Sequence, residues 1–158
     1  RSKLWGVDDA GRVMAGLLKD CDVLIASEAD AGQLFGVTGT GFADVAEKLA
    51  ARFGLTAVAG VKRETPLVWR NRFGAVGWSG GRFYESPWYE VEIVDRLGAG
   101  DALASGLIHG LLGGDFEAGL LYGAAMGAIK HSVPGDLPWI DKSEVEAVLA
   151  GGGLRIKR

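Results

Sequence analysis

Residues 94–102 read Val-Asp-Arg-Leu-Gly-Ala-Gly-Asp-Ala, and a helical pattern follows at once. Gly98 and Gly100 carry no side chain, so the backbone there can come close to a ligand. The first N–H groups of a helix have no partner within it, and with the helix dipole they favour an anion such as phosphate. Asp101 would repel that phosphate, but it could take the proton from a hydroxyl that attacks phosphorus. On spacing alone, an ordinary helix start is the commoner explanation of such a short motif.

The composition is that of a globular protein with excess glycine. Of the 158 residues, 26 are glycine and 4 are proline, without a Gly-X-Y period, which excludes collagen and a Pro/Gly-rich disordered tract. Hydrophobic residues make up 48%, enough to bury a core, and the length suits one domain or part of a larger one. The net charge of -3 provides no basic surface for nucleic acid, and two histidines with one cysteine argue against a structural zinc site.

The two ends and the cysteine give expectations about the cellular setting. The chain has no run of 18 apolar residues and no signal peptide, so we expect a cytoplasmic protein that does not bind membranes. Cys21 precedes an apolar run, and we expect a buried, reduced thiol. The sequence starts Arg-Ser-Lys-Leu-Trp, without an initiator Met, and we expect it to be the C-terminal portion of a longer chain.

Strand and helix patterns alternate over the first sixty residues. Short apolar runs predict buried strands over 22–26 and 56–60, and helical spacing predicts helices over 8–20, 27–35 and 44–53. Residues 67–94 alternate with aromatic residues and glycine turns, which indicates a hairpin region. Helices are predicted over 99–113, 116–131 and 142–150. This order favours an α/β fold with a parallel sheet.

Residues 95–101 resemble the C-terminal signature of the ribokinase-like, or phosphofructokinase-B type, carbohydrate kinases, in which the pattern is Asp-Thr-x-Gly-Ala-Gly-Asp. Three further stretches are most similar to 2-keto-3-deoxygluconate kinases, namely residues 107–112, 130–136 and 151–158. The resemblance covers essentially the whole chain. It implies a ribokinase-like fold with a parallel central sheet flanked by helices, of which residues 1–158 would be one partial domain, the nucleotide-binding C-terminal portion without the lid and the N-terminal half.

The resemblance implies ATP-dependent, Mg²⁺-assisted phosphorylation of 2-keto-3-deoxygluconate to its 6-phosphate. Asp101 would be the general base, and the N–H groups of Gly98, Ala99 and Gly100 would form the anion hole. Two alternatives stay open: a kinase of another sugar, such as fructose or ribose, and a non-catalytic nucleotide-binding module. The isolated chain is expected to be inactive, and the full-length enzyme could be a homo-oligomer.

Four more residues take roles from the resemblance. Arg1 and Asp136 match positions that contact the acid sugar, although a solvated terminal charge and a plain turn residue are the simpler interpretations. Ser27 and Asp30 fall on an Asn-x-x-Glu element that orders phosphates and, through water, magnesium; here both residues depart from the pattern. Ser27 followed by Asp30 also suits a helix-capping box.

The nucleotide is expected to meet two other segments. Gly60, Lys62 and Arg63 match an ATP loop that would follow the strand over 56–60, although exposed basic loop residues are usually only solvated. Ala124 and Ala125 match small residues beside the adenine, a role that is compatible with helix packing.

Much of the excess glycine recurs at four-residue spacing. One set is Gly106, Gly110 and Gly114, and the other is Gly119, Gly123 and Gly127. Each set lines one helix face, so we expect these faces to lie close against each other or against the nucleotide.

Overall fold

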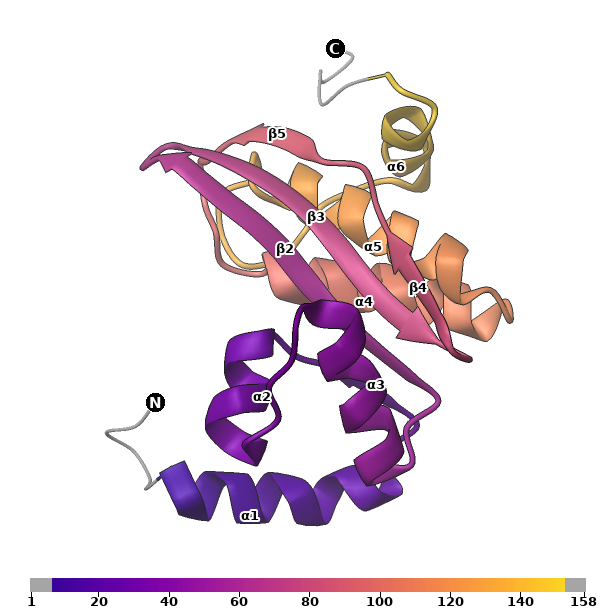
Figure 1. Ribbon diagram of the computed structural model, residues 1–158. Helices are drawn as coiled ribbons and strands as arrows, with labels where there is room; N and C mark the ends of the chain where they lie inside the picture. The colour runs from indigo at the N-terminus through magenta and orange to yellow at the C-terminus, as the bar shows by residue number, and fades with distance from the viewer. Residues whose placement is uncertain (1–6, 153–158) are drawn as a thin grey trace. The chain divides into compact units, whose positions relative to one another are not determined.

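The computed structural model describes residues 7–152, so Arg1 and the tail over 153–158 lie outside the described residues. Helices and strands alternate and then give way to helices alone (Figure 1). In chain order the elements are α1 (Val7–Leu17), the 3₁₀ helix η1 (Leu18–Asp20), β1 (Val23–Ile25), α2 (Glu28–Phe35), α3 (Phe42–Phe53), β2 (Ala57–Leu67), β3 (Arg70–Ser79), β4 (Arg82–Glu85), β5 (Tyr89–Glu92), α4 (Ala99–Leu112), α5 (Phe116–Lys130) and α6 (Lys142–Leu149).

The strands form one mixed sheet in the order β1-β2-β3-β4, with β5 paired to β3. β1 and β2 are parallel, with Leu24 opposite Val58. Two helices, α2 and α3, connect these strands, which is the long connection that a parallel pair requires. β3 and β5 are antiparallel, with Asn71 opposite Val91. The α/β class is therefore confirmed, and the predicted hairpin region supplies the antiparallel part of the sheet.

Glycines end two of the helices where the sequence predicts it. Gly36 closes α2 with φ 65°, and Gly54 closes α3 with φ 74°. Both lie in the left-handed region, which a residue without Cβ adopts at little cost.

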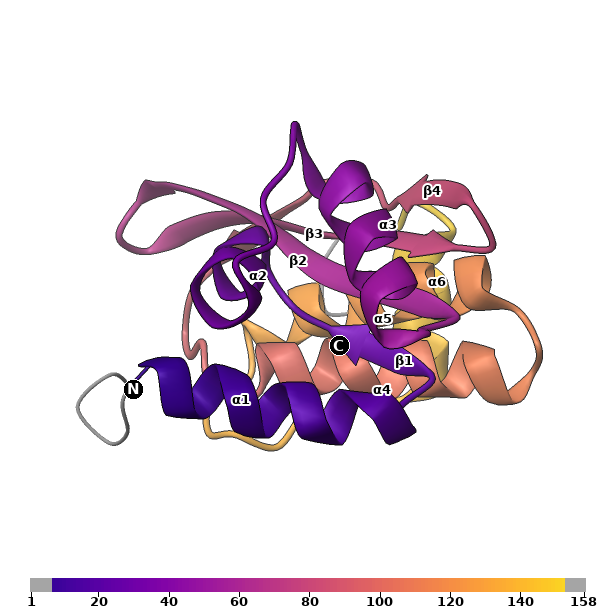
Figure 2. The same cartoon turned by 60° about the horizontal axis from the view of Figure 1, so that its bottom comes forward.

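The described chain divides into two compact units. Among the described residues, the first unit comprises 7–60 and 77–83. Its core joins α3 to the sheet, because Val45, Ala46 and Leu49 repeat at helical spacing and pack in one cluster with Val58 of β2. Met14 and Ala15 of α1 pack against the same cluster. Figure 2 shows α1, α2 and α3 of this unit.

Among the described residues, the second unit comprises 61–76 and 84–152, and its helices α4 and α5 pack through their glycines. The two helices lie side by side in Figure 1. A Cβ on Gly106 would overlap the backbone of Gly123, and one on Gly110 would overlap the backbone of Gly119. The predicted close approach of two glycine faces is confirmed. Gly114 is the exception, because it has φ 77° and lies in the turn after α4.

The structure corrects two sequence-based expectations. β2 continues to Leu67, so Gly60, Lys62 and Arg63 lie within a strand rather than in a loop after it. The stretch looks like a loop because it is exposed and polar beyond Gly60, but β3 lies beside it in the sheet and supplies backbone partners. Cys21 is exposed, at the end of η1, and its Sγ donates to the carbonyl of Leu17 at 3.4 Å.

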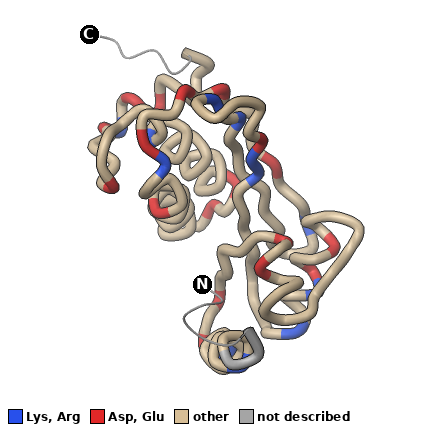
Figure 3. Tube along the Cα trace, turned by 90° about the vertical axis from the view of Figure 1, so that its left-hand side faces the viewer, with Lys and Arg blue, Asp and Glu red and all other residues tan. Residues whose placement is uncertain are grey.

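The charged residues form no block in the sequence. Acidic and basic residues are interspersed along the chain (Figure 3). Among residues 7–152, no helix is long and apolar enough to cross a membrane.

Candidate active site

The motif at residues 95–101 forms the turn that begins α4. Gly98 is the N-cap of this helix, with φ 83°, and the first α-helical hydrogen bond runs from the Ala102 N–H to the Gly98 carbonyl at 2.8 Å. The Ala99 N–H donates to the Arg96 carbonyl at 3.4 Å. The amides of Gly100 and Asp101 precede the first bond within the helix, so helix geometry leaves them available to an anion.

Gly98 is held against another segment of the second unit. A Cβ at this position would overlap the backbone carbonyl of Asp136 and would lie 3.2 Å from Cε of Lys130. Both the left-handed φ and this close approach require glycine. The turn therefore brings the segment that carries Asp136 next to the start of α4.

Asp101 lies exposed in the first turn of α4. Its backbone carbonyl accepts a hydrogen bond from Ser105 Oγ at 2.9 Å. Within the described part of the chain, no donor and no cation contacts its carboxylate. An exposed carboxylate without a competing partner can accept a proton from a bound hydroxyl.

Asp95 links the turn to residues 131–136 by hydrogen bonds. Its Oδ1 accepts the Leu97 N–H at 2.9 Å, and its Oδ2 accepts the Gly135 N–H at 3.1 Å. These amides, that of Leu97 first, and the positive charge of Lys130 hold the pKa of Asp95 below its usual value, because they favour the charged carboxylate. Aspartate is common in turns, where its side chain accepts from the amide two residues on. The presence of an Asp at position 95 is therefore the one local signal of this role in the sequence.

A buried polar chain supports the same region from β3. Asn71 and His131 are almost fully buried, and Asn71 Nδ2 lies 3.4 Å from His131 Nε2. His131 Nδ1 lies 2.7 Å from the Gly127 carbonyl, so Nδ1 carries the proton and Nε2 accepts from Asn71. Burial, above all, lowers the pKa of His131, because it disfavours the charged imidazolium. The His131 carbonyl in turn accepts the N–H groups of Val94 and Asp95, at 2.8 and 3.2 Å.

Ala124, Ala125 and Asp136 also belong to the second unit. Asp136 is exposed and follows Gly135, whose φ is 83°. Ala124 and Ala125 are fully buried in α5, and Ala125 packs in one cluster with Val145 of α6. Their small size is thus used in packing, and contact with an adenine stays a prediction.

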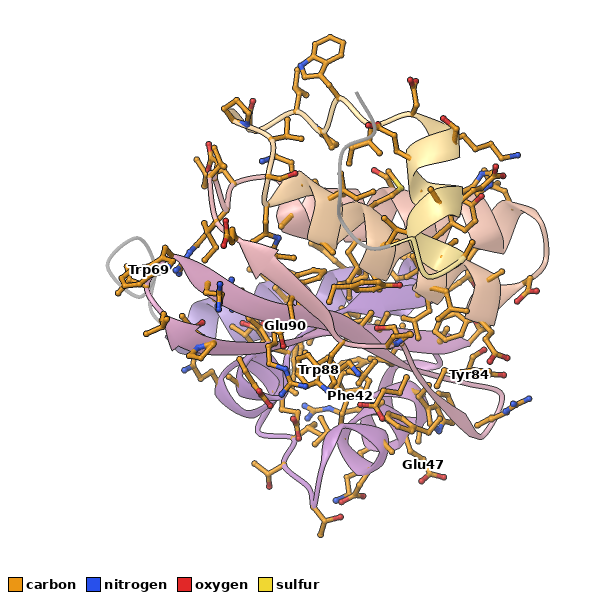
Figure 4. The ribbon with its side chains drawn as sticks, turned by 90° about the horizontal axis from the view of Figure 1, so that it is seen from above. Phe42, Glu47, Trp69, Tyr84, Trp88 and Glu90 are labelled. Carbon is orange, nitrogen blue, oxygen red and sulfur yellow. The ribbon has the colours of Figure 1, made fainter. Side chains whose placement is uncertain are left out.

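Lys62 and Arg63 are neighbours in β2, so their side chains leave the strand on opposite faces. Lys62 Nζ donates to Glu85 at 2.9 Å and to the Ser86 carbonyl, and lies 4.4 Å from the centre of the Trp88 ring, which Figure 4 labels. The positive charge of Arg63 contributes, after burial, to the lowered pKa of His131. A single phosphate group can therefore meet only one of these two side chains while the strand is intact.

The remaining expected residues belong to the first unit. Ser27 caps α2 in a capping box: Ser27 Oγ accepts the Asp30 N–H at 3.1 Å, and Asp30 Oδ2 accepts the Ser27 N–H at 3.2 Å. Gly60 is buried, and a Cβ there would overlap the Phe42 ring and the Ala26 carbonyl. Over residues 7–152, no three His, Cys, Asp or Glu side chains converge as a metal site.

The sequence matches the pfkB carbohydrate kinases over residues 4–141. A 2-dehydro-3-deoxygalactonokinase of Haloferax volcanii is 38% identical over the whole of this chain, which covers 47% of that protein. The crystal structure of a 2-dehydro-3-deoxygluconokinase from Thermotoga maritima superposes with a TM-score of 0.90 at 32% identity, over 96% of this chain and 48% of that one. A pfkB family kinase from Listeria grayi gives 0.87 at 26%, over 95% and 48%. The chain thus spans about half the length of the relatives it matches.

Proposed function

Because this chain belongs to the pfkB family of carbohydrate kinases, we propose that it carries the phosphoryl-transfer centre of an ATP-dependent kinase for a 2-keto-3-deoxy sugar acid. The observation that carries the proposal is Asp101, an exposed carboxylate in the first turn of α4, directly after a turn whose close packing admits only glycine. The first turn of α4 thus holds a carboxylate that can accept a proton, on Asp101, and the N–H groups of Gly100 and Asp101, which have no acceptor within the helix.

Phosphoryl transfer needs two things from this turn. Asp101 takes the proton of the sugar hydroxyl, such as the 6-hydroxyl of 2-keto-3-deoxygluconate, as its oxygen attacks the γ-phosphorus and the bond to ADP breaks. The amides of Gly98, Ala99 and Gly100 form the anion hole, and those of Gly100 and Asp101 are the least occupied by other acceptors. The positive end of the α4 dipole adds to the same stabilisation.

The other expected residues complete the proposal. Ser27 and Gly60 would serve the nucleotide phosphates. Lys62 and Arg63, which leave β2 on opposite faces, are alternative cations for those phosphates, and Ala124 and Ala125 would contact the adenine. Mg²⁺ neutralises phosphate charge and commonly keeps several waters, which suits an outer contact with the exposed Asp30 carboxylate.

We propose an acidic sugar as substrate because a cation suits a carboxylate. Arg1 would supply that cation, and Asp136 would accept from sugar hydroxyl groups. The Haloferax and Thermotoga relatives carry the names of two different sugar acids, so the configuration of the sugar is the first variable to test. Fructose and ribose represent the neutral alternatives.

The test is a kinase assay of the full-length gene product with ATP and Mg²⁺ against both 2-keto-3-deoxy acids, fructose and ribose. Asp101→Asn should lower kcat about 100- to 10,000-fold, the usual contribution of a general base. The matched control is Asp20→Asn, at an exposed position of η1, and should leave kcat unchanged. An Asp101→Asn enzyme within a few-fold of the wild type would show that Asp101 is not the base.

Calorimetry with ATP and Mg²⁺ separates the kinase from a non-catalytic module. A kinase must bind the nucleotide and turn over one of the sugars. Binding without turnover of any sugar would favour the module, and absence of both would refute the nucleotide site. Residues 1–158 alone are expected to bind ATP weakly and to phosphorylate nothing measurable.

A further inference from the structure

Lys130, the last residue of α5, is 0% exposed and is among the largest fully buried side chains. Lysine is almost never fully buried without a partner, because removing an ammonium group from water is costly. No carboxylate among the described residues lies within ion-pair distance of Lys130 Nζ. The usual reason for burying a charge, a direct salt bridge, is therefore missing.

Lys130 lies next to the turn that begins α4 and to the segment packed against that turn. Nζ donates to the Val133 carbonyl at 2.9 Å, and Cε lies against Gly98, 3.2 Å from where a Cβ would stand. The charge also reaches Asp95, which binds the amides of Leu97 and Gly135. The side chain thus lies against the Gly98 turn through Cε, and its ammonium group binds the segment that is packed against that turn.

Helix capping alone does not explain this placement. A lysine in the last turn of a helix complements the dipole, but it can do so from the surface with its ammonium group in water. Lys142, an exposed lysine in the described part of the second unit, keeps its charge in solvent. Because a surface charge would complement the dipole equally well, the burial of Lys130 against Gly98 needs another explanation.

We propose that Lys130 is a positioning residue for phosphoryl transfer: its buried ammonium group is an internal positive charge behind the Gly98 turn. It holds residues 131–136 against the start of α4 through Val133, and it makes the anion hole more positive. This role rests on the kinase function proposed above. The charge belongs to the protein, so it is in place before any phosphate arrives.

The decisive variants remove the charge in two ways. Lys130→Met keeps the length of the side chain and loses both charge and donor, whereas Lys130→Gln keeps a donor without the charge. In the full-length gene product, each should lower kcat at least tenfold and weaken ATP binding, while KM for the sugar changes less than twofold. Lys130→Met fills a similar volume, so stability in urea should fall only through the lost hydrogen bond to the Val133 carbonyl, which the donor of Lys130→Gln can replace. The exposed control Lys142→Met should keep kcat within twofold.

Chemical rescue distinguishes positioning by charge from simple packing. Lys130→Ala leaves a buried space, and added methylammonium should restore part of kcat, whereas the bulkier tetramethylammonium should not. In Lys130→Gln, the carboxyl of Asp95 should titrate at higher pH by carbon-13 NMR, a readout that needs no activity. If Lys130→Met does not fold, Lys130→Gln gives the same kinetic comparison.

The outcomes separate the two proposals. A wild type that phosphorylates a sugar, with kcat of Lys130→Met and Lys130→Gln within twofold of it, would overturn the role of Lys130 alone. Loss of stability in urea with kcat preserved would do the same, since it shows a purely structural lysine. A wild type that neither binds ATP nor phosphorylates any sugar would overturn the proposed function, and the role of Lys130 with it.

Discussion

The contact between α4 and α5 makes Gly106→Ala a sharp test of the fold. The added Cβ would overlap the backbone N and Cα of Gly123 on the facing helix. Backbone atoms cannot rotate away as a side chain can, so the helices must separate until the carbon atoms stand about 3.5–4.0 Å apart. Overpacking a core costs about 1–3 kcal/mol, and a clash with backbone belongs in the upper half of that range.

Alanine also favours the helix, which offsets part of this loss. It gains up to about 1 kcal/mol over glycine within a helix, so the expected net loss is about 1–2 kcal/mol. Gly16→Ala in α1 is the matched control, because a Cβ there meets no atom within 4 Å. That variant should be about 0.5–1 kcal/mol more stable than the wild type.

The assay is urea unfolding followed by circular dichroism, with the free energy of unfolding compared across the variants. The free energies of unfolding of Gly106→Ala and Gly16→Ala should differ by about 1.5–3 kcal/mol, with the first below and the second above the wild type. If the two variants agree within about 0.5 kcal/mol, α4 and α5 are not in backbone contact. Gly123→Leu, which overlaps the Leu103 carbonyl with a larger side chain, should prevent folding or abolish ATP binding.

Three further predictions concern the second unit. The pKa of His131 is lowered, so the stability that the neutral ring contributes should be complete above about pH 6.5 and be lost as the pH falls below that value. Urea unfolding at a series of pH values measures this loss, and His131→Asn should reduce the dependence of stability on pH. Asp95→Asn places an amide group against the Leu97 or Gly135 N–H, and should lower the urea midpoint and kcat together; unchanged values of both would contradict the bridge. Gly98→Ala should lower the free energy of unfolding by at least about 1–2 kcal/mol from the left-handed φ alone. Gly100→Ala is the control, because a Cβ there meets no atom within 4 Å, and equal stability of the two variants would contradict the prediction.

The helices could be predicted from sequence because local signals set their ends. Gly36 and Gly54 end α2 and α3, and apolar spacing identifies the buried face of α3. The glycine spacing likewise indicated the contact between α4 and α5. Beyond Gly60 the sequence is polar, so only the pairing of β2 with β3, which no local pattern shows, extends the strand to Leu67.

The candidate site was predictable only in part, for a similar reason. Gly98 and Asp101 are three positions apart, so a short motif contains both. The bridge from Asp95 to Gly135 joins residues 40 positions apart, and nothing local announces it. The burial of Lys130 is set by the packing of its neighbours, and lysine is ordinarily a surface residue.

The glycine contact between α4 and α5 also has a mechanical consequence. Ordering a long side chain costs up to about 2 kcal/mol of rotamer entropy, and glycine costs none, so this part of the interface forms without that loss. Because glycine has no side chain, this contact also has no rotamers that could change when one helix is displaced. We therefore expect α4 and α5 to move together, so that a ligand bound to the amides at the start of α4 displaces α5 as well.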